Sequence, residues 1–322
     1  MKLGVLTNLF ANMPFDEALD RFEALGIESV EVGCGGFPGK AHADPAVLLH
    51  DDRALSDWRR TIERHHMDVS ALSAHGNPVH PDKEKAKAFH DDFVNAVLLA
   101  EKIGVDTVVT FSGCPGGSPE DKTPNWATCA WPDDFLGVLD YQWNEVLIPY
   151  WKETAAFAAS HGVRKIAFEM HPGFCVYNPE TLLRLRAAVG DVIGANFDPS
   201  HLIWQGIDPV AAIRALDGAI YHFHAKDTKI DKYNTAKFGV LDTKHYSDEA
   251  HRSWIFRSVG YGNGLDYWRD MISALRLAGY DKVMSIEHED SLMTPEEGLA
   301  HAVAFLKESI IRAPKPGTMS WA

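Results

Sequence analysis

Residues 165–198 read KIAFEMHPGFCVYNPETLLRLRAAVGDVIGANFD and hold one complete strand, helix and strand. Short apolar runs predict strands at Lys165–His171 and Ile193–Asp198, and the amphipathic stretch between them predicts a helix at Pro179–Ala188. A capping asparagine and a proline begin this helix, and a glycine follows its last turn. The stretch therefore predicts two parallel strands joined by a crossover helix.

The same unit recurs from one end of the chain to the other. Eight strands are predicted, at Lys2–Thr7, Ser29–Cys34, Val69–His75, Asp106–Ser112, Lys165–His171, Ile193–Asp198, Ile220–Ala225 and Lys282–Glu289. Helices are predicted between and after them, at Phe15–Leu25, Ala54–His66, Lys83–Ile103, Tyr141–Ser160, Pro179–Ala188, Pro209–Leu216, Leu265–Ala278 and Pro295–Ile310. Eight repeats with short helix-to-strand turns favour an α/β fold of a single (β/α)8 TIM barrel over a doubly wound sheet. We assign the barrel to residues 1–312 and a C-terminal tail to residues 313–322.

Two of the predicted connections from strand to helix are long. They span Gly113–Asp140 after the fourth strand and Thr228–Gly264 after the seventh. Connections of this kind leave the carboxyl end of the barrel, which is where barrel enzymes carry their active sites. We therefore expect the functional residues at this end.

Composition excludes several classes of protein. The chain has 322 residues, of which 46% are hydrophobic and 24% charged, as in ordinary globular proteins. With 45 acidic and 31 basic residues its net charge is -14, which disfavours binding to a nucleic-acid backbone. We find no apolar run of the roughly 20 residues that a membrane span needs and no secretion signal, so we expect a cytoplasmic protein. The spacing of the cysteines, Cys34, Cys114, Cys129 and Cys175, predicts free thiols.

Charged residues and histidines close the last four predicted strands. Side chains alternate across a strand, so the apolar neighbours of these residues should face the outer helices and the polar residues the barrel mouth. The outward set is Phe168, Phe197, Phe223 and Ile286. The inward set is Glu169, Asp198, His224 and Glu287.

Three carboxylates and one imidazole directed at a single point would repel one another unless a cation lay between them. We predict one divalent metal ion held by Glu169, Asp198, His224 and Glu287. Three oxygen ligands and one nitrogen favour Mn²⁺, and are compatible with Mg²⁺, Co²⁺ or Zn²⁺. Each residue has an ordinary alternative: Asp198 could cap a helix, the glutamates could be solvated loop acids, and His224 could be a hydrogen-bonded core histidine.

The order of these motifs resembles a known family. The motifs are Glu169, then Asp198-x-x-His201, then His224-x-Lys226-Asp227, then Glu287. They resemble the xylose isomerase-like TIM barrels of sugar phosphate isomerases and epimerases, and the resemblance covers nearly the whole chain. It implies the fold and the metal site. The chain also resembles one branch, the catalytic subunit of bacterial C-glycoside deglycosidases, which acts on 3-keto-glycosides with a small second subunit.

The residues and the resemblance together predict a divalent-metal-dependent sugar isomerase or epimerase. The metal would hold a carbonyl and its neighbouring hydroxyl and stabilise an enediolate, while Glu169 and Glu287 remove and return a proton. His171 shares the inward face of Glu169 and is a further candidate base. Contacts with substrate are predicted for Asn8, His75, His201, Lys226, Arg257 and Trp131.

One alternative is lyase chemistry, in which the same enolate expels a group from the neighbouring carbon. The resemblance to the deglycosidases would then imply cleavage of 3-keto-C-glycosides with a small partner subunit. The tryptophans of the long loops and the apolar end Thr318–Ala322 are compatible with such a hetero-oligomer and equally with a homo-oligomer.

Two further alternatives lie outside sugar chemistry or outside catalysis. The type IV apurinic endonucleases share the fold and the motif order, but their three-zinc site needs more histidines than this chain offers. Its fourth strand ends Thr110-Phe111-Ser112-Gly113, without a histidine. A non-catalytic sugar-binding subunit would not need an intact set of metal ligands, so measuring bound metal separates that alternative.

Overall fold

The predicted single TIM barrel is confirmed. The computed structural model describes residues 1–314 and 317, in which eight parallel strands close into a barrel. In barrel order they are β1 (Lys2–Leu6), β10 (Val283–Ile286), β7 (Ile220–Ala225), β6 (Ile193–Phe197), β5 (Lys165–Glu169), β4 (Thr107–Thr110), β3 (Asp68–His75) and β2 (Ser29–Gly36). The predicted tail contact at 318–322 lies outside the described residues.

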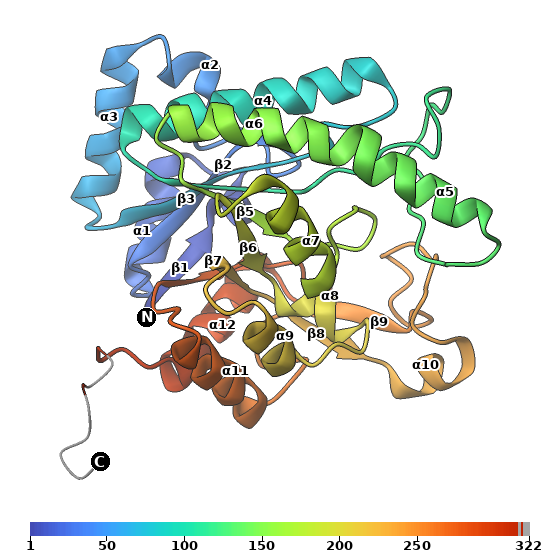
Figure 1. Cartoon of the computed structure of the whole chain (residues 1–322). Coiled ribbons are helices and arrows are strands. Elements are labelled where there is room, and N and C mark those ends of the chain that lie inside the picture. The colour runs from blue at the N-terminus through green and yellow to red at the C-terminus, as the bar shows by residue number, and fades with distance from the viewer. Residues whose placement is uncertain (315–316, 318–322) are drawn as a thin grey trace.

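The eight predicted helices surround the barrel in the predicted order (Figure 1). They are α1 (Phe15–Ala24), α3 (Asp52–Arg64), α4 (Lys83–Ile103), α6 (Ile148–Ser160), α7 (Pro179–Val189), α9 (Pro209–Ala215), α11 (Leu265–Leu277) and α12 (Pro295–Ser309). The outward apolar face of the strands packs against them. Phe168 of β5 lies edge-on to Trp151 of α6, with ring centroids 4.6 Å apart, and Phe223 of β7 contacts Trp268 of α11. The predicted alternation of side chains is therefore confirmed for these strands.

The long connections contain elements that the sequence pattern did not predict. The segment after β4 ends in α5 (Asp134–Asp140), which continues through a π-helical turn, η2 (Tyr141–Leu147), into α6. The segment after β7 contains a hairpin of β8 (Asp227–Ile230) and β9 (Trp254–Arg257), with α10 (Lys232–Phe238) between them. The hairpin forms because Trp254 and Phe256 pack with Trp204 in a small separate core.

Smaller differences concern strand ends and short turns. Predicted strands four, five and eight run two or three residues too far, because their carboxyl-terminal residues leave the sheet around the cavity. The remaining short elements are η1 (Thr7–Phe10), α2 (Pro45–Leu48) and α8 (Pro199–Ile203).

All four cysteines are free thiols, and of these only Cys129 is exposed. In the described part of the chain, no helix combines the length and hydrophobicity needed to cross a membrane.

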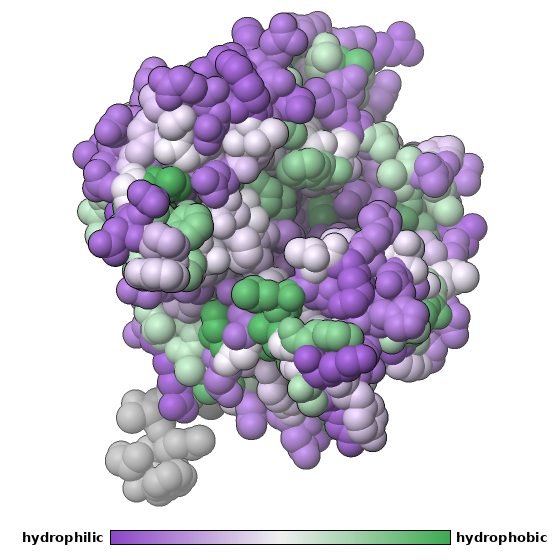
Figure 2. Space-filling model, turned by 90° about the vertical axis from the view of Figure 1, so that its right-hand side faces the viewer, coloured by the Kyte–Doolittle hydropathy of each residue, from purple (hydrophilic) through white to green (hydrophobic). Residues whose placement is uncertain are grey.

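The carboxyl ends of the strands open toward the side that carries α10 and the β8–β9 hairpin. Figure 2 shows that side hollowed at its centre, with hydrophobic and hydrophilic residues both on the rim. Part of the barrel interior is polar, and Glu31, Asn196, His222 and His224 are all buried in it. The fold therefore places a buried polar cluster directly beneath an open cavity.

Candidate functional site

The structure brings the four predicted metal ligands together. Glu169 ends β5, Asp198 follows β6, His224 lies in β7 and Glu287 follows β10. One possible ligand atom from each residue lies within 4.8 Å of the others. Glu169, Asp198 and His224 are buried, and the side chain of Glu287 is 13% exposed.

Two atoms of this cluster are left without a hydrogen bond, which fits a bound cation. Nδ1 of His224 lies 3.2 Å from Oε2 of Glu169 and 3.0 Å from Oε2 of Glu287, yet is hydrogen-bonded to neither. Oδ2 of Asp198 is likewise buried without a hydrogen bond, and its charged neighbour is the ammonium of Lys226 at 3.0 Å. Buried polar atoms rarely stay unpaired, and carboxylate oxygens with an imidazole nitrogen are ligands of divalent ions. The four residues therefore form a candidate site for a divalent metal ion.

Asp198 also fulfils the alternative role considered from the sequence. Its Oδ1 accepts a hydrogen bond of 2.8 Å from the backbone N–H of Ser200 and so caps α8. A carboxylate has two oxygens, so capping occupies one and leaves Oδ2 facing the other ligands. The two roles are compatible, and the cap fixes the direction of the free oxygen.

Lys226 lies among the ligands and is almost completely buried. Its Nζ is 3.0 Å from Oδ2 of Asp198, 2.8 Å from Oε2 of Glu287 and 3.0 Å from Oε2 of Glu289. Burial opposes the charge on Lys226, but the surrounding carboxylates hold the pKa of its ammonium group well above the usual value. This ammonium compensates part of the negative charge of the cluster and presents a donor to the cavity.

Three neighbouring side chains hold the carboxylate of Glu169. Nε2 of His201 lies 3.0 Å from its Oε1, while Nε2 of His75 and Nδ2 of Asn196 lie 3.1 Å and 3.3 Å from its Oε2. Burial alone would raise the pKa of Glu169, but the neighbouring imidazoles of His201, His224 and His75 hold it well below the usual value. The carboxylate is therefore charged and fixed in direction.

Glu31 is a functional candidate that sequence reasoning missed. It lies in β2, is fully buried, and accepts hydrogen bonds from Nε2 of His224 at 2.9 Å and from Oγ of Ser285 at 2.7 Å. The hydroxyl of Ser73 is a further donor. A carboxylate on one nitrogen of a histidine fixes its tautomer and leaves the other nitrogen free for a metal. The sequence contained one indication of Glu31, a glutamate within a buried strand. The same feature had identified Glu169.

Half of the predicted substrate contacts, together with the candidate base His171, line the cavity above the cluster. Asn8, His75, His171 and Lys226 line it, with Glu169 and Glu287 at its base. His201 lies just behind, with its ring centroid 4.0 Å from that of His171. The other lining residues are Leu6, Phe37, Pro38, Phe111 and Glu289. Burial lowers the pKa of His171, so this imidazole is neutral at neutral pH, as a base must be.

Arg257 and Trp131 do not line this cavity. The guanidinium of Arg257 in β9 donates to Oδ2 of Asp290 at 2.9 Å, and this ion pair links the hairpin to the segment after β10. Trp131 lies in the segment after β4 with 77% of its surface exposed. The structure therefore gives neither residue the substrate contact that we predicted for it.

A sequence model of the xylose isomerase-like TIM barrel family matches residues 19–309. The chain belongs to this family.

The chain is also similar to individual proteins and structures. Uncharacterised protein YfiH of Bacillus subtilis (strain 168) is 40% identical over 312 residues, which covers 96% of this chain and 99% of YfiH. Inosose dehydratase of Lacticaseibacillus casei is 21% identical over 296 residues, covering 88% and 85% of the two chains. The crystal structure of IOLI protein with a binding zinc atom matches with a TM-score of 0.66 at 21% identity, covering 96% and 98%.

In this xylose isomerase-like barrel a glycine-rich segment, residues 260–264, lies directly before α11, and the structure explains its glycines. The backbone N–H groups of Gly260, Gly262 and Asn263 donate to Oδ2 of Asp227 at 3.1, 3.1 and 2.9 Å. A Cβ at Gly262 would lie 2.4 Å from Oδ1 of the same carboxylate. The segment thus wraps around Asp227 at the start of α11, which keeps the neighbouring Lys226 directed into the cluster.

Metal binding is expected to release protons. In the metal-free protein burial raises the pKa of Asp198 to about 7, although Lys226 opposes the shift. Burial opposes the charge on His224, but Glu31 and Glu287 hold its pKa well above the usual value. Both groups must lose a proton to bind a cation, so the apparent affinity for Mn²⁺ should rise with pH up to and beyond 7. Below the pKa of each of these two groups, the apparent affinity for Mn²⁺ should increase about tenfold per pH unit for each proton that binding releases.

Calorimetric titration with Mn²⁺ at a single pH, in two buffers of different ionisation enthalpy, measures this release. The observed heat should differ between the buffers in proportion to the protons released. Equal heats in both buffers would show that the ligands are already deprotonated and would contradict the prediction.

Proposed function

We propose that the protein is a divalent-metal-dependent enzyme that moves a proton at the carbon next to a carbonyl group, and so isomerises or epimerises a small keto-sugar or keto-polyol. One observation carries this proposal. Glu169 and Glu287 both direct a carboxylate oxygen to the candidate metal position and both line the cavity above it. One acid on each side of a bound substrate suits removal of a proton from one position and its return at another.

The residues of the cavity have different roles in this reaction. Glu169, charged and held by His75, His201 and Asn196, removes the carbon-bound proton. Glu287, with its pKa lowered to about 2 by Lys226 and His224 against the effect of burial, takes a proton from solvent water and returns it to the carbon, while Glu169 passes the proton that it removed to solvent. His171 is a second candidate base, and Lys226 and Asn8 donate hydrogen bonds to substrate oxygens.

A divalent ion held by Glu169, Asp198, His224 and Glu287 would polarise the carbonyl and stabilise the negative charge that develops when the proton leaves. We propose Mn²⁺ as the preferred ion because three of the four ligand atoms are carboxylate oxygens. Mg²⁺, Co²⁺ and Zn²⁺ suit the same set. The zinc in the IOLI structure supports a divalent ion in this fold without deciding its identity.

The proposal is tested by proton exchange with solvent. Protein reconstituted with Mn²⁺ is incubated in D₂O with a panel of ketohexoses, ketopentoses and keto-inositols, and deuterium incorporation and product configuration are followed by NMR. We expect deuterium at one carbon next to a carbonyl and a new isomer or epimer, both abolished by EDTA and restored by Mn²⁺. Absence of exchange with every member of the panel in metal-loaded protein would contradict the proposal.

Elimination is a second candidate, and one observation favours it. The inosose dehydratase of Lacticaseibacillus casei aligns with 88% of this chain. Dehydration needs the same first step, after which the electron pair expels a leaving group from the adjacent carbon instead of accepting a proton. The same reasoning extends to release of the aglycone from a 3-keto-C-glycoside with a small partner subunit. Adding these compounds to the panel and measuring leaving-group release separates elimination from epimerisation.

A further inference from the structure

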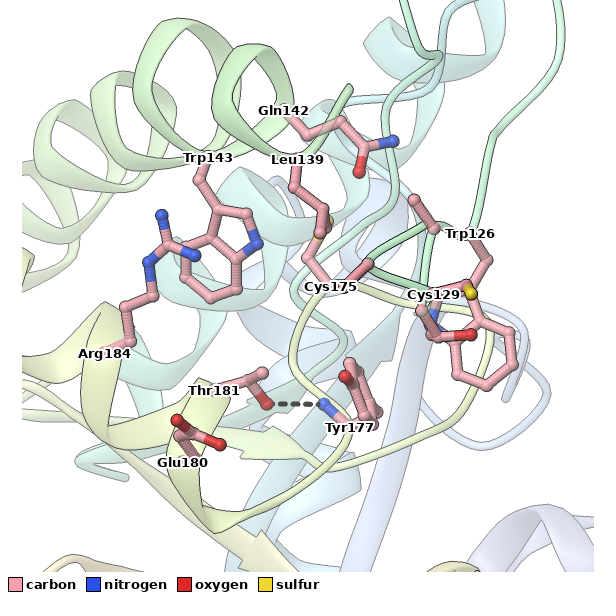
Figure 3. Close-up of a pocket in the computed structure, with 13 residues that line it drawn as sticks. Trp126, Cys129, Leu139, Gln142, Trp143, Cys175, Tyr177, Glu180, Thr181 and Arg184 are labelled. Carbon is pink, nitrogen blue, oxygen red and sulfur yellow. Dashed lines mark hydrogen bonds between the residues drawn. The ribbon is translucent and has the colours of Figure 1, made fainter. Parts of the chain in front are cut away.

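A second cavity lies beside the barrel mouth and shares no lining residue with the metal cavity. Its volume is about 260 Å³. It lies between α5, η2, the first turns of α7 and the segments that follow β4 and β5 (Figure 3). Its walls are largely aromatic, formed by Trp126, Trp143 and Tyr177. Trp126 and Tyr177 meet edge to face with ring centroids 5.5 Å apart.

Several polar groups at this cavity lack partners within the chain. Nε2 of Gln142 donates to the carbonyl oxygens of Pro115, Gly116 and Asn125, at 3.1, 3.1 and 2.6 Å. These three bonds fix the amide and leave its Oε1, which accepts no hydrogen bond among the described residues, as a free acceptor. Gln142 is 1% exposed, so the cavity rather than bulk solvent is what this oxygen faces. This oxygen is therefore available to accept a hydrogen bond from a molecule in the cavity.

The wall of this cavity also carries a positive charge and a hydrogen-bond donor. The guanidinium carbon of Arg184 lies over the ring of Trp143, 4.1 Å from its centroid. Within residues 1–314 and 317, Arg184 forms no ion pair and Nε1 of Trp143 donates no hydrogen bond. Glu180, one turn before Arg184, also lines the cavity and is exposed at its rim. A molecule in the cavity would therefore meet an exposed guanidinium and an indole N–H on this wall.

The backbone at this wall is unusual. Gln142 and Trp143 lie in η2, a π-helical turn of seven residues, and both are buried. π-Helical turns are rare and are found disproportionately at functional sites. Both of these consecutive side chains line the cavity.

We propose that this cavity binds a planar aromatic carboxylate that carries a hydroxyl group on its ring. The carboxylate would pair with Arg184 and the indole N–H of Trp143, the ring would lie against Trp126 and Tyr177, and the hydroxyl would donate to Oε1 of Gln142. The site is distinct from the metal centre and does not depend on the reaction proposed there. The two cavities lie on opposite sides of one segment, because Phe174 stacks on Phe111 of the metal cavity while Cys175 lines the second cavity.

The probe is 4-hydroxybenzoate, titrated into the full-length protein with tryptophan fluorescence and calorimetry as readouts. We expect saturable binding of one molecule per chain with a dissociation constant of about 1 mM or tighter, in reach of a ligand of this size. Cyclohexanecarboxylate, which has the charge but no aromatic ring, should bind at least about tenfold more weakly. Absence of saturable binding, or equal binding of the two acids, would overturn the proposal.

A pair of arginine variants identifies the site. Arg184→Leu should weaken binding of 4-hydroxybenzoate about tenfold or more, because it removes the charge that the carboxylate needs. Arg164→Leu is the matched control, since Arg164 is an exposed arginine outside the cavity with 79% of its side chain exposed. It should bind the probe like the unmodified chain. Unchanged binding by Arg184→Leu, with the thermal unfolding temperature also unchanged, would exclude this cavity as the site.

Discussion

Replacing Glu169 or Glu287 by glutamine is expected to lower the rate of deuterium exchange next to the carbonyl by about 10²- to 10⁴-fold. Each substitution removes a proton acceptor and one negatively charged oxygen of the ligand cluster, while the side chain keeps nearly the same shape. The loss should therefore appear in the rate of the chemical step as well as in metal content. Exchange rates measured at saturating Mn²⁺ separate the loss in the rate of the chemical step from the loss of bound metal.

The two variants should differ in stability. Glu169 accepts from His75, His201 and Asn196, and a glutamine offers only one oxygen where the carboxylate offers two. Glu169→Gln leaves at least one buried donor without an acceptor, which costs about 1–3 kcal/mol. Glu287 is nearer the surface, and Lys226 keeps Asp198 and Glu289 as partners when Glu287 is replaced. Glu287→Gln should therefore unfold at a temperature closer to that of the unmodified protein.

A surface glutamate provides the control for these measurements. Glu308 lies on α12 with 66% of its side chain exposed, and its contact is a 3.5 Å ion pair with Arg269. Glu308→Gln should keep the full metal content, exchange rate and unfolding temperature. If Glu169→Gln or Glu287→Gln also kept full exchange with a full complement of metal, the assignment of these residues as acid and base would be wrong.

The fold and the central residues of the site follow from short-range patterns in the sequence. Alternation along single strands is a local property, so it predicts that Phe168 and Phe223 face the helices and that Glu169 and His224 face the interior. Closing eight such strands into a barrel then converges their carboxyl ends without any further information. This is why the four predicted ligands lie together although 118 residues of chain separate Glu169 from Glu287.

What the sequence did not predict depends on contacts between distant segments. Glu31 meets His224 across the barrel, 193 residues further along the chain, and no pattern within β2 specifies that partner. The hairpin of β8 and β9 forms where Trp204 and Trp254 stack with centroids 4.5 Å apart, again a contact that periodicity does not encode. Arg257 and Trp131 lie in such irregular segments, and their positions depend on packing rather than on alternation.

The second large effect is expected at Glu31, which touches no substrate and acts through His224. Glu31→Gln should lower the affinity for Mn²⁺ by about 10- to 100-fold, the usual effect of losing a carboxylate partner of a metal-binding histidine. A carboxylate can only accept, so when His224 loses one proton on metal binding the remaining proton stays on Nε2 and Nδ1 is free for the metal. An amide can also donate to Nε2, in which case the proton moves to Nδ1 and blocks the metal position.

Competition between the protein and a chelator of known affinity measures this loss, with thermal unfolding of the metal-free variant as a check on folding. Glu28→Gln is the matched control, because Glu28 lies three residues earlier but is bound to Arg312 at the surface, with 39% of its side chain exposed. It should bind Mn²⁺ like the unmodified chain. Nitrogen chemical shifts of the imidazole of His224 report the tautomer directly. If Glu31→Gln keeps both the Nε2-protonated tautomer and the full affinity, Glu31 has no role in metal binding.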